Sequence, residues 1–470
     1  MLFSSITFIF LFIPVFFTIY ILIPAKWKNS FALLSSIVFY AWGAPQFVFI
    51  LSVAVICDFY LARHIAKLEG KERKYWLLLA IGINLSILFY FKYANFFVET
   101  VTHLFGVESS SFVQVLLPIG ISFFTFHEIS YLTDVYRKTK APFDNLINYA
   151  LYIFLFPQLL VGPIIRFHEI VDQIENRNFY DTTENRLLGF FRFAIGLAKK
   201  VLLADVLAIH VDKMFSLSYG IPDVTTAWLG AFLNVLHIYI DFSAYSDMAL
   251  GLALMMGFRF PENFNSPLIA ESVTEFWLRW HMSLNRWLRE YIYIPLGGNR
   301  GTELQTCLNI LTVFLLSGIW HGANWNFIIW GICCGLVIIG ERVFLQQLLK
   351  KAPRVIRILV AQGLIAMLLV LFKCHSVKQG FHYLQYMYTS TSHTAILFFS
   401  LKTKLVIAIS IFIAIGSLHP YLERLAHHLY SPSKNRLHYG WMLAGSIVLV
   451  VLSASYISII GQHPFLYFKF

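Results

Sequence analysis

The chain has 470 residues, of which 58% are hydrophobic and only 13% are charged, and it carries a formal net charge of +11. Soluble globular proteins contain about 25% charged residues, so a chain of mean hydropathy +0.68 needs lipid to cover part of its surface. These values exclude an ordinary soluble protein and indicate an integral membrane protein.

Apolar runs as long as a membrane-spanning helix recur along the chain, from residues 2–24 and 31–56 to residues 441–460. Only helices and closed barrels satisfy backbone hydrogen bonds in hydrocarbon, and these runs are too long and too uniformly apolar for barrel strands. A span needs about 20 apolar residues, and the sequence predicts an all-α, polytopic membrane protein with about 11–13 hydrophobic segments, some of them re-entrant.

The positive charge gathers in short loops between the apolar segments, first over residues 63–74 and then at Arg137, Lys138 and Lys140. This distribution is the positive-inside pattern, and it predicts that these loops are cytoplasmic. It accounts for the net charge without nucleic acid as a partner. A basic cytoplasmic face would also attract an anionic, phosphorylated substrate.

Five cysteines are present, and none has the spacing of a zinc site or a disulfide framework. They are expected to pack as small apolar residues, and no metal site is predicted.

No repeat or low-complexity linker divides the chain, so we expect a single domain with three zones: N-terminal helices over 1–110, a more polar core over 112–345, and C-terminal helices over 355–470.

The most polar part of the core lies between Arg259 and Arg300, where charged residues alternate with aromatic residues. A stripe at helical spacing predicts one helix over 271–291, lying at the membrane interface or dipping into a cavity. Its members are Phe276, Trp280, Leu284 and Trp287. The segment Pro295-Leu-Gly-Gly-Asn-Arg300 that follows predicts a turn.

The motif that contains His321 follows the apolar run Leu308 to Leu316 and precedes another, Phe327 to Ile339, so His321 lies near the end of a hydrophobic segment. Ionisable groups in membrane segments are functional candidates, and the near-neutral pKa of histidine suits a general base that deprotonates a hydroxyl. The small neighbours Gly322 and Ala323 would let a substrate approach the imidazole. A structural histidine at the membrane interface is the alternative.

His281 and Asn285 are four residues apart and are expected to share one helix face. Either side chain could orient a second group or polarise a carbonyl as a hydrogen-bond donor. A solvated interfacial face is the alternative for this pair.

Asp241 lies in a third polar stretch, Tyr239 to Asp247, which interrupts an apolar run with two acids and several hydroxyls. A buried structural network is the alternative there, because no further residue has the spacing of a metal ligand.

The chain contains no Gly-x-Ser-x-Gly elbow, P-loop or dinucleotide fingerprint. Its polar motifs instead resemble the membrane-bound O-acyltransferase family, and within it the AlgI-like branch of alginate O-acetylation. D-alanyl transferases of teichoic acids and membrane subunits of peptidoglycan O-acetylation are relatives. The matching motifs include Phe91-Lys-Tyr-Ala-Asn95, Leu117-Pro-Ile-Gly-Ile-Ser-Phe123, Tyr131-Leu-Thr-Asp-Val-Tyr-Arg137, Gly257-Phe-Arg-Phe-Pro-Glu-Asn-Phe264, Arg279-Trp-His-Met-Ser283 and Trp320-His-Gly-Ala-Asn324.

This resemblance implies site residues and a reaction. His321 matches the catalytic histidine of the family, His281 matches an upstream polar position, and Asp241, Asn285 and Asn324 are supporting candidates. The implied enzyme is an O-acetyltransferase with a central catalytic tunnel. Between Leu371 and Ser376 the sequence departs from the branch, and we expect packing or partner contact there.

The resemblance also implies substrates, partners and a location. No cofactor is bound, acetyl-CoA is the donor, and a periplasmic acetyltransferase of the SGNH type is the partner. The acceptor is a cell-envelope polysaccharide, and an alginate-like exopolysaccharide is favoured over peptidoglycan. The location is the bacterial inner membrane. A transporter or scaffold that conducts acetyl groups or polymer without catalysis is the alternative from another class.

Overall fold

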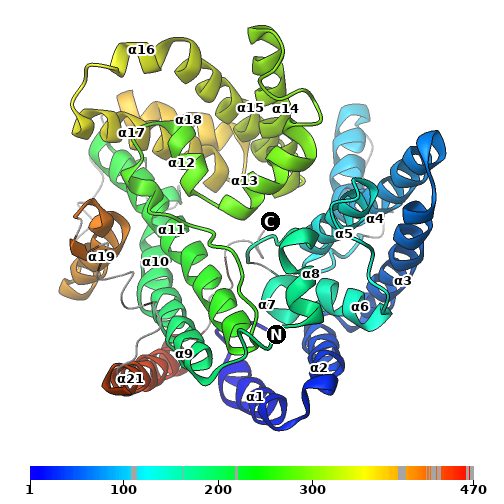
Figure 1. Ribbon diagram of the computed structural model, residues 1–470. Coiled ribbons are helices and arrows are strands. Elements are labelled where there is room, and N and C mark those ends of the chain that lie inside the picture. Colours follow the sequence, from blue (N-terminus) through cyan, green and yellow to red (C-terminus); the bar gives the residue numbers. More distant parts are fainter. Residues whose placement is uncertain are drawn as a thin grey trace. The chain divides into compact units, whose positions relative to one another are not determined.

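The computed structural model describes residues 1–106, 114–160, 162–216, 221–389, 399–419, 421, 422, 424, 430, 436–461 and 465. Every secondary-structure element in these residues is a helix, which confirms the predicted fold class (Figure 1). The chain forms two compact units. Unit 1 comprises Met1–Phe190 and Met248–Pro261, and unit 2 comprises Phe191–Asp247 and Glu262–Phe470. These units divide the chain differently from the three predicted zones, whose functional meaning stays a prediction.

Eight helical segments among the described residues are long and apolar enough to cross a membrane, so the protein is a multi-pass membrane protein. They are Pro45–Lys67, Gly70–Phe105, Val224–Met255, Glu303–His321, Trp325–Leu349, Arg354–Lys373, Leu401–Leu418 and Arg436–Ile459. A shorter apolar helix covers Phe8–Leu22. The 11–13 hydrophobic segments predicted from the sequence stay a prediction, and the predicted segment 2–24 contains this shorter helix.

Unit 1 packs its long helices α3 and α4 around α5, whose side chains are buried over almost its whole length. The helices of this unit are η1 (Phe8–Phe12), α1 (Ile13–Leu22), η2 (Ala25–Trp27), α2 (Lys28–Gly43), α3 (Pro45–Lys67), α4 (Gly70–Phe105), α5 (Ile121–Tyr136), α6 (Leu146–Phe154), α7 (Phe156–Leu159) and α8 (Phe167–Glu175). The stacked rings of Tyr131 and Tyr149, 4.2 Å between centroids, join α5 to α6. Residues 248–261 also belong to this unit, and Tyr20 of α1 donates a hydrogen bond to the Met256 carbonyl at 2.7 Å.

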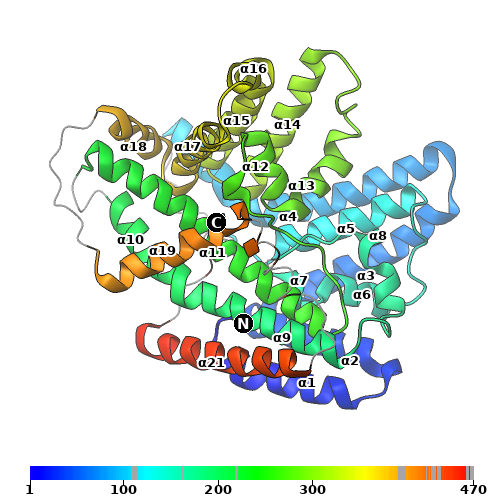
Figure 2. The same ribbon diagram turned by 60° about the vertical axis from the view of Figure 1, so that its left-hand side comes forward.

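Two helices run through the boundaries of the units, α9 (Thr183–Ala198) and α11 (Val224–Met255). The other helices belong to unit 2, whose α-helices Figure 2 labels. They are η3 (Lys199–Ala204), α10 (Asp205–Phe215), η5 (Pro267–Ile269), α12 (Val273–Arg279), α13 (Met282–Leu288), η6 (Arg289–Tyr293), α14 (Glu303–His321), α15 (Trp325–Gly340), η7 (Glu341–Leu345), α16 (Gln346–Leu349), α17 (Arg354–Lys373), α18 (Val377–Thr389), α19 (Leu401–Ile415), η8 (Gly416–Leu418) and α21 (Arg436–Ile460).

Helices α14 and α15 form a tightly packed hairpin in unit 2 (Figure 1). The chain turns between them at Gly322, and the side chain of Asn324 caps α15 by accepting the backbone N–H of Asn326 at 3.1 Å. The two backbones touch where Gly318 meets Gly331, since a Cβ built on Gly318 would lie 3.0 Å from the Gly331 Cα. Small residues permit this close approach in membrane helices.

The single helix predicted over 271–291 is wrong, because the chain breaks it into α12 and α13 at Trp280 and His281. The backbone of His281 is left-handed, with φ 42° and ψ 52°. All four members of the predicted apolar stripe are nevertheless buried. Burial of the stripe follows from its periodicity, whereas the break depends on contacts with distant residues. The turn predicted at Pro295–Arg300 is present, with positive φ at Gly297 and Gly298.

Candidate active site

A small cavity of about 60 Å³ lies in unit 2, walled by α12, α13 and α14. Its lining consists of aromatic and aliphatic side chains and four polar side chains. The lining residues are Trp277, Trp280, His281, Leu284, Asn285, Leu288, Val313, Phe314, Ser317 and His321. One water molecule needs a cavity of about 10–15 Å³, so this cavity has room for a group of a few non-hydrogen atoms. A concave apolar site with few polar groups is the usual form of a small-molecule site.

His321 reaches this cavity from the last residue of α14. The close contact of Gly318 with Gly331, one turn earlier, fixes where α14 ends relative to α15. Three aromatic rings hold the imidazole, with centroids 4.8 Å (Trp320), 5.1 Å (Trp330) and 5.3 Å (Phe372) away. The side chain is therefore buried in an aromatic setting, and the residue is 8% exposed.

The contact of Phe372 with His321 gives a packing role to the segment Leu371–Ser376, where the sequence departs from the AlgI-like branch.

Packing also explains why residue 322 is a glycine, because a Cβ there would lie 2.3 Å from the Phe327 ring. Tight packing, rather than access for a substrate, accounts for the glycine beside His321.

His281 reaches the same cavity from the break between α12 and α13. Its Nδ1 lies 3.0 Å from the side-chain oxygen of Asn263, and its ring makes an edge contact with Phe242 at 4.7 Å. The residue is 3% exposed, and burial lowers the pKa of its imidazole to about 3. His281 is therefore neutral at physiological pH.

Asn285 lines the cavity from α13, and its amide donates to the Trp277 carbonyl at 2.9 Å. The bond ties α13 to α12 across the break. His321, His281 and Asn285, which the sequence places in two separate motifs, thus lie around one cavity.

Asp241 does not line this cavity. Its carboxylate lies 2.7 Å from the ammonium of Lys200, which also lies 2.8 Å from Asp205, and all three side chains are buried. Burial disfavours the charge on Lys200, but Asp241 and Asp205 outweigh it and raise the pKa of the ammonium. Asp241 thus belongs to a buried ion-pair network between α11 and η3. A buried structural network is the alternative that the sequence analysis leaves open for Asp241.

Asn324 is exposed and does not line the cavity either. Its side chain serves as the cap of α15 described above. This position supports His321 indirectly, since the cap fixes the start of the helix that packs on α14.

The helix that precedes His281 is anchored at its start by long-range contacts. Glu341 at the end of α15 accepts the backbone N–H groups of Val273 and Thr274 at 2.7 and 2.8 Å. Glu271 lies 2.5 Å from Arg357 of α17. These contacts position α12 from two other helices of unit 2.

Sequence reasoning missed the positions of Asn263 and Glu341. Asn263 lies inside the quoted motif Gly257–Phe264, but nothing in that motif shows its contact with His281. Glu341 carries a detectable signal, because it is an acidic residue at the end of an apolar run.

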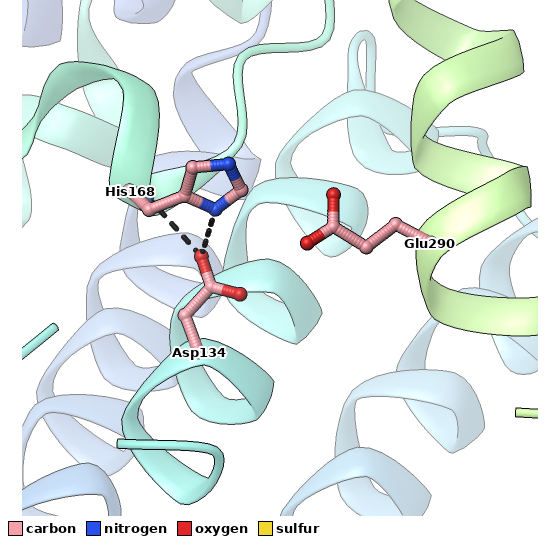
Figure 3. Close-up of side chains that lie close together, drawn as sticks. All are labelled: Asp134, His168 and Glu290. Carbon is pink, nitrogen blue, oxygen red and sulfur yellow. Dashed lines mark hydrogen bonds and ion pairs between the residues drawn. The ribbon is translucent and has the colours of Figure 1, made fainter. Parts of the chain in front are cut away.

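Unit 1 contains a buried polar pair that sequence reasoning also missed. The carboxylate of Asp134 on α5 lies 2.9 Å from Nδ1 of His168 on α8 and accepts the His168 backbone N–H at 3.2 Å (Figure 3). Asp134 is completely buried. The pair ties α5 to the first turn of α8, a structural task that the motif Tyr131–Arg137 did not reveal.

Comparisons with known proteins place these features in context. The model of the membrane-bound O-acyltransferase family (MBOAT) matches residues 75–382, which include His281, Asn285 and His321. The chain is 44% identical over 382 residues to a probable alginate O-acetylase AlgI of Azotobacter vinelandii, covering 80% of this chain and 76% of the relative. It is also 44% identical to the probable alginate O-acetylase AlgI of Pseudomonas aeruginosa, over 76% of this chain and 68% of the relative. A peptidoglycan O-acetyltransferase of Helicobacter pylori is 34% identical over 81% of this chain and 78% of its own length.

Proposed function

Because this chain belongs to the membrane-bound O-acyltransferase family and is an O-acyltransferase, we propose that it transfers acetyl from acetyl-CoA for the O-acetylation of a cell-envelope polysaccharide. Its relatives named for alginate are more similar to it than the relative named for peptidoglycan. An alginate-like exopolysaccharide is therefore the proposed acceptor. The proposed location is the bacterial inner membrane, with the donor arriving from the cytoplasm.

The observation that carries this proposal is the meeting of His321 and His281 at one small cavity. Two imidazoles beside a space for a few atoms are suited to moving a proton during acyl transfer. The basic loops predicted to face the cytoplasm support an anionic donor such as acetyl-CoA.

In the proposed reaction His321 acts as the general base. Its imidazole takes the proton of a hydroxyl while the hydroxyl oxygen attacks the thioester carbonyl carbon. The tetrahedral intermediate then breaks its C–S bond and expels the thiolate of CoA, which recovers the proton from His321. His281 orients the reactants or stabilises the developing charge. General base catalysis of this kind contributes about 10²–10⁴-fold to the rate.

The hydroxyl that receives the acetyl group belongs to the polymer or to a periplasmic protein that completes the transfer. We propose a partner of the SGNH type for this second step, as the family resemblance implies. No cofactor takes part in the proposed reaction.

The acceptor is tested by replacing the chromosomal gene with wild type, His321→Ala or His382→Ala and measuring base-labile acetate on purified exopolysaccharide and on peptidoglycan. His382 is an exposed histidine on α18, which makes it a matched control. The proposal predicts that His321→Ala loses acetate from the exopolysaccharide while His382→Ala keeps it. Loss from peptidoglycan alone would replace the proposed acceptor with peptidoglycan.

A further inference from the structure

His281 is held in an unusual backbone conformation by the segment around Asn263. Non-glycine residues seldom adopt the left-handed region, and they do so where surrounding contacts impose it. The backbone N–H of Met282 donates to the Asn263 carbonyl at 2.9 Å, and that of Asn265 donates to the Arg279 carbonyl at 2.9 Å. Backbone hydrogen bonds on both sides of His281 thus fix the break between α12 and α13.

The side chain of Asn263 has a definite orientation. Its Oδ1 lies 3.3 Å from the backbone nitrogen of Ser283 and 2.9 Å from the Ser283 hydroxyl. A backbone N–H can only donate, so the atom facing it must be the amide oxygen and not the amide nitrogen. Asn263 is 1% exposed, so no competing water contact from bulk solvent is expected.

This orientation determines the tautomer of His281. Its Nδ1 lies 3.0 Å from the same oxygen of Asn263. Because that oxygen accepts, Nδ1 must carry the hydrogen and donate, and in a neutral imidazole Nε2 then carries the lone pair. Nε2 is buried and has no hydrogen-bond partner among the described residues. His281 lines the cavity and Asn263 does not. Because Nδ1 faces Asn263, the opposite edge of the ring, which carries Nε2, is the edge available to the cavity.

Among the residues that the structure describes, no charged side chain contributes to the pKa of this imidazole. Phe242 of α11 and Trp320 of α14 face the ring, at 4.7 and 6.3 Å between centroids. Asn263 and Ser283 supply the polar contacts, and His321 is the other titratable group of the cavity. Burial is the sole cause of the lowered pKa of His281.

We propose that Asn263 is a positioning residue that locks His281 in the Nδ1–H tautomer, so that Nε2 serves the cavity as a hydrogen-bond acceptor. This inference rests on the proposed function and assigns one of the two roles left open there for His281. A neutral His281 with this tautomer cannot donate to the carbonyl oxygen of the thioester. It orients the reactants by accepting a hydrogen bond from a bridging water or from a second hydroxyl of the acceptor, while His321 takes the proton.

Two variants of Asn263 test this assignment, one through the titration of His281 and one through acetyl transfer from labelled acetyl-CoA. Asn263→Asp keeps an oxygen for all three donors, so the fold is retained, and its negative charge stabilises the imidazolium. The pKa of His281 then rises by about 1 unit or more, and Nε2 is protonated at a higher pH. Nitrogen-15 NMR of labelled histidine measures this rise directly, whereas the acid limb of the pH–rate profile reports the general base His321. Asn263→Ala frees the tautomer and lowers kcat on the order of 10-fold or more with little change in KM for acetyl-CoA.

Asn265→Asp is the matched control, because its side chain is exposed and lies in the same segment. Its His281 is expected to titrate as in the wild type. A His281 that also titrates as in the wild type in Asn263→Asp would overturn the assignment, and so would kcat and KM that are unchanged in folded Asn263→Ala. Should Asn263→Ala fail to fold, the titration of His281 in Asn263→Asp decides alone.

His321→Ala in the same assay separates this inference from the proposed function. If His321→Ala abolishes transfer and Asn263→Asp shows no shift, only the role of Asn263 fails. If His321→Ala transfers acetyl as well as the wild type, the proposed function fails. Nitrogen-15 NMR of labelled histidine, with His281→Gln identifying the signal, is expected to show hydrogen on Nδ1 of His281, and hydrogen on Nε2 would contradict the proposal.

Discussion

Glu341 accepts the backbone N–H of Val273 at 2.7 Å and thereby joins the end of α15 to the first residue of α12. The second carboxylate oxygen accepts the N–H of Thr274 at 2.8 Å. The first N–H groups of a helix have no partner inside the helix, so this buried carboxylate satisfies two of them. The helix that precedes His281 is thus positioned by a residue from the far end of the hairpin that carries His321.

Replacing Glu341 with Gln is expected to destabilise the protein by about 1–3 kcal/mol and to lower acetyl transfer. A glutamine offers one acceptor oxygen, and its amide nitrogen would face an N–H of α12 that can only donate. The measurement is thermal unfolding in detergent together with transfer in vesicles. Glu303→Gln is the control, because Glu303 pairs with Arg342 on the surface, where ion pairs contribute little. Equal melting temperatures for the two variants would contradict the capping role.

The break between α12 and α13 shows what local sequence could not predict. The spacing of Phe276, Trp280, Leu284 and Trp287 fits a continuous helix and correctly indicates a buried face. The left-handed backbone of His281 depends instead on hydrogen bonds that Asn263, 18 residues away, accepts from His281 and Met282. A periodic pattern contains no information about such a partner, so the break could not be predicted from the pattern.

Replacing Gly331 with Ala is expected to reduce both stability and acetyl transfer. The new Cβ would lie 2.4 Å from the Phe314 carbonyl oxygen, so α14 must move away from α15 and displace His321. Overpacking of this kind costs about 1–3 kcal/mol. Gly340→Ala in the same helix is the control, because a Cβ there meets nothing within 4 Å. Thermal unfolding and the rate of transfer are compared, and a Gly331→Ala variant as stable and active as Gly340→Ala would be inconsistent with the close contact.

Replacing Lys200 with Met is expected to destabilise unit 2 by about 3–5 kcal/mol, because Asp205 and Asp241 would keep buried charges without their shared cation. Thermal unfolding in detergent measures the loss. Lys404→Met on the exposed face of α19 serves as the control and should melt like the wild type. A Lys200→Met variant as stable as the wild type would contradict the structural role of this network.

The site residues separate by the kind of signal that revealed them. His321 and His281 stand out as polar groups in an apolar sequence and match family motifs, whereas Asn285 stands out by its spacing from His281. All three line one cavity. Asn324 and Asp241 stand out for the same reason, yet the first caps a helix and the second pairs with Lys200. Chemical type alone does not distinguish a residue facing a cavity from one that satisfies the fold. That distinction requires the packing of helices distant in sequence.

The most direct test of the proposed chemistry is acetyl transfer from labelled acetyl-CoA in inverted membrane vesicles that contain wild type, His321→Ala or His382→Ala at equal expression. The predicted result is loss of transfer in His321→Ala alone, with the protein still folded by thermal unfolding in detergent. Unchanged transfer in folded His321→Ala would contradict the role of His321 as general base. The chain would then conduct acetyl groups to a partner that performs the chemistry.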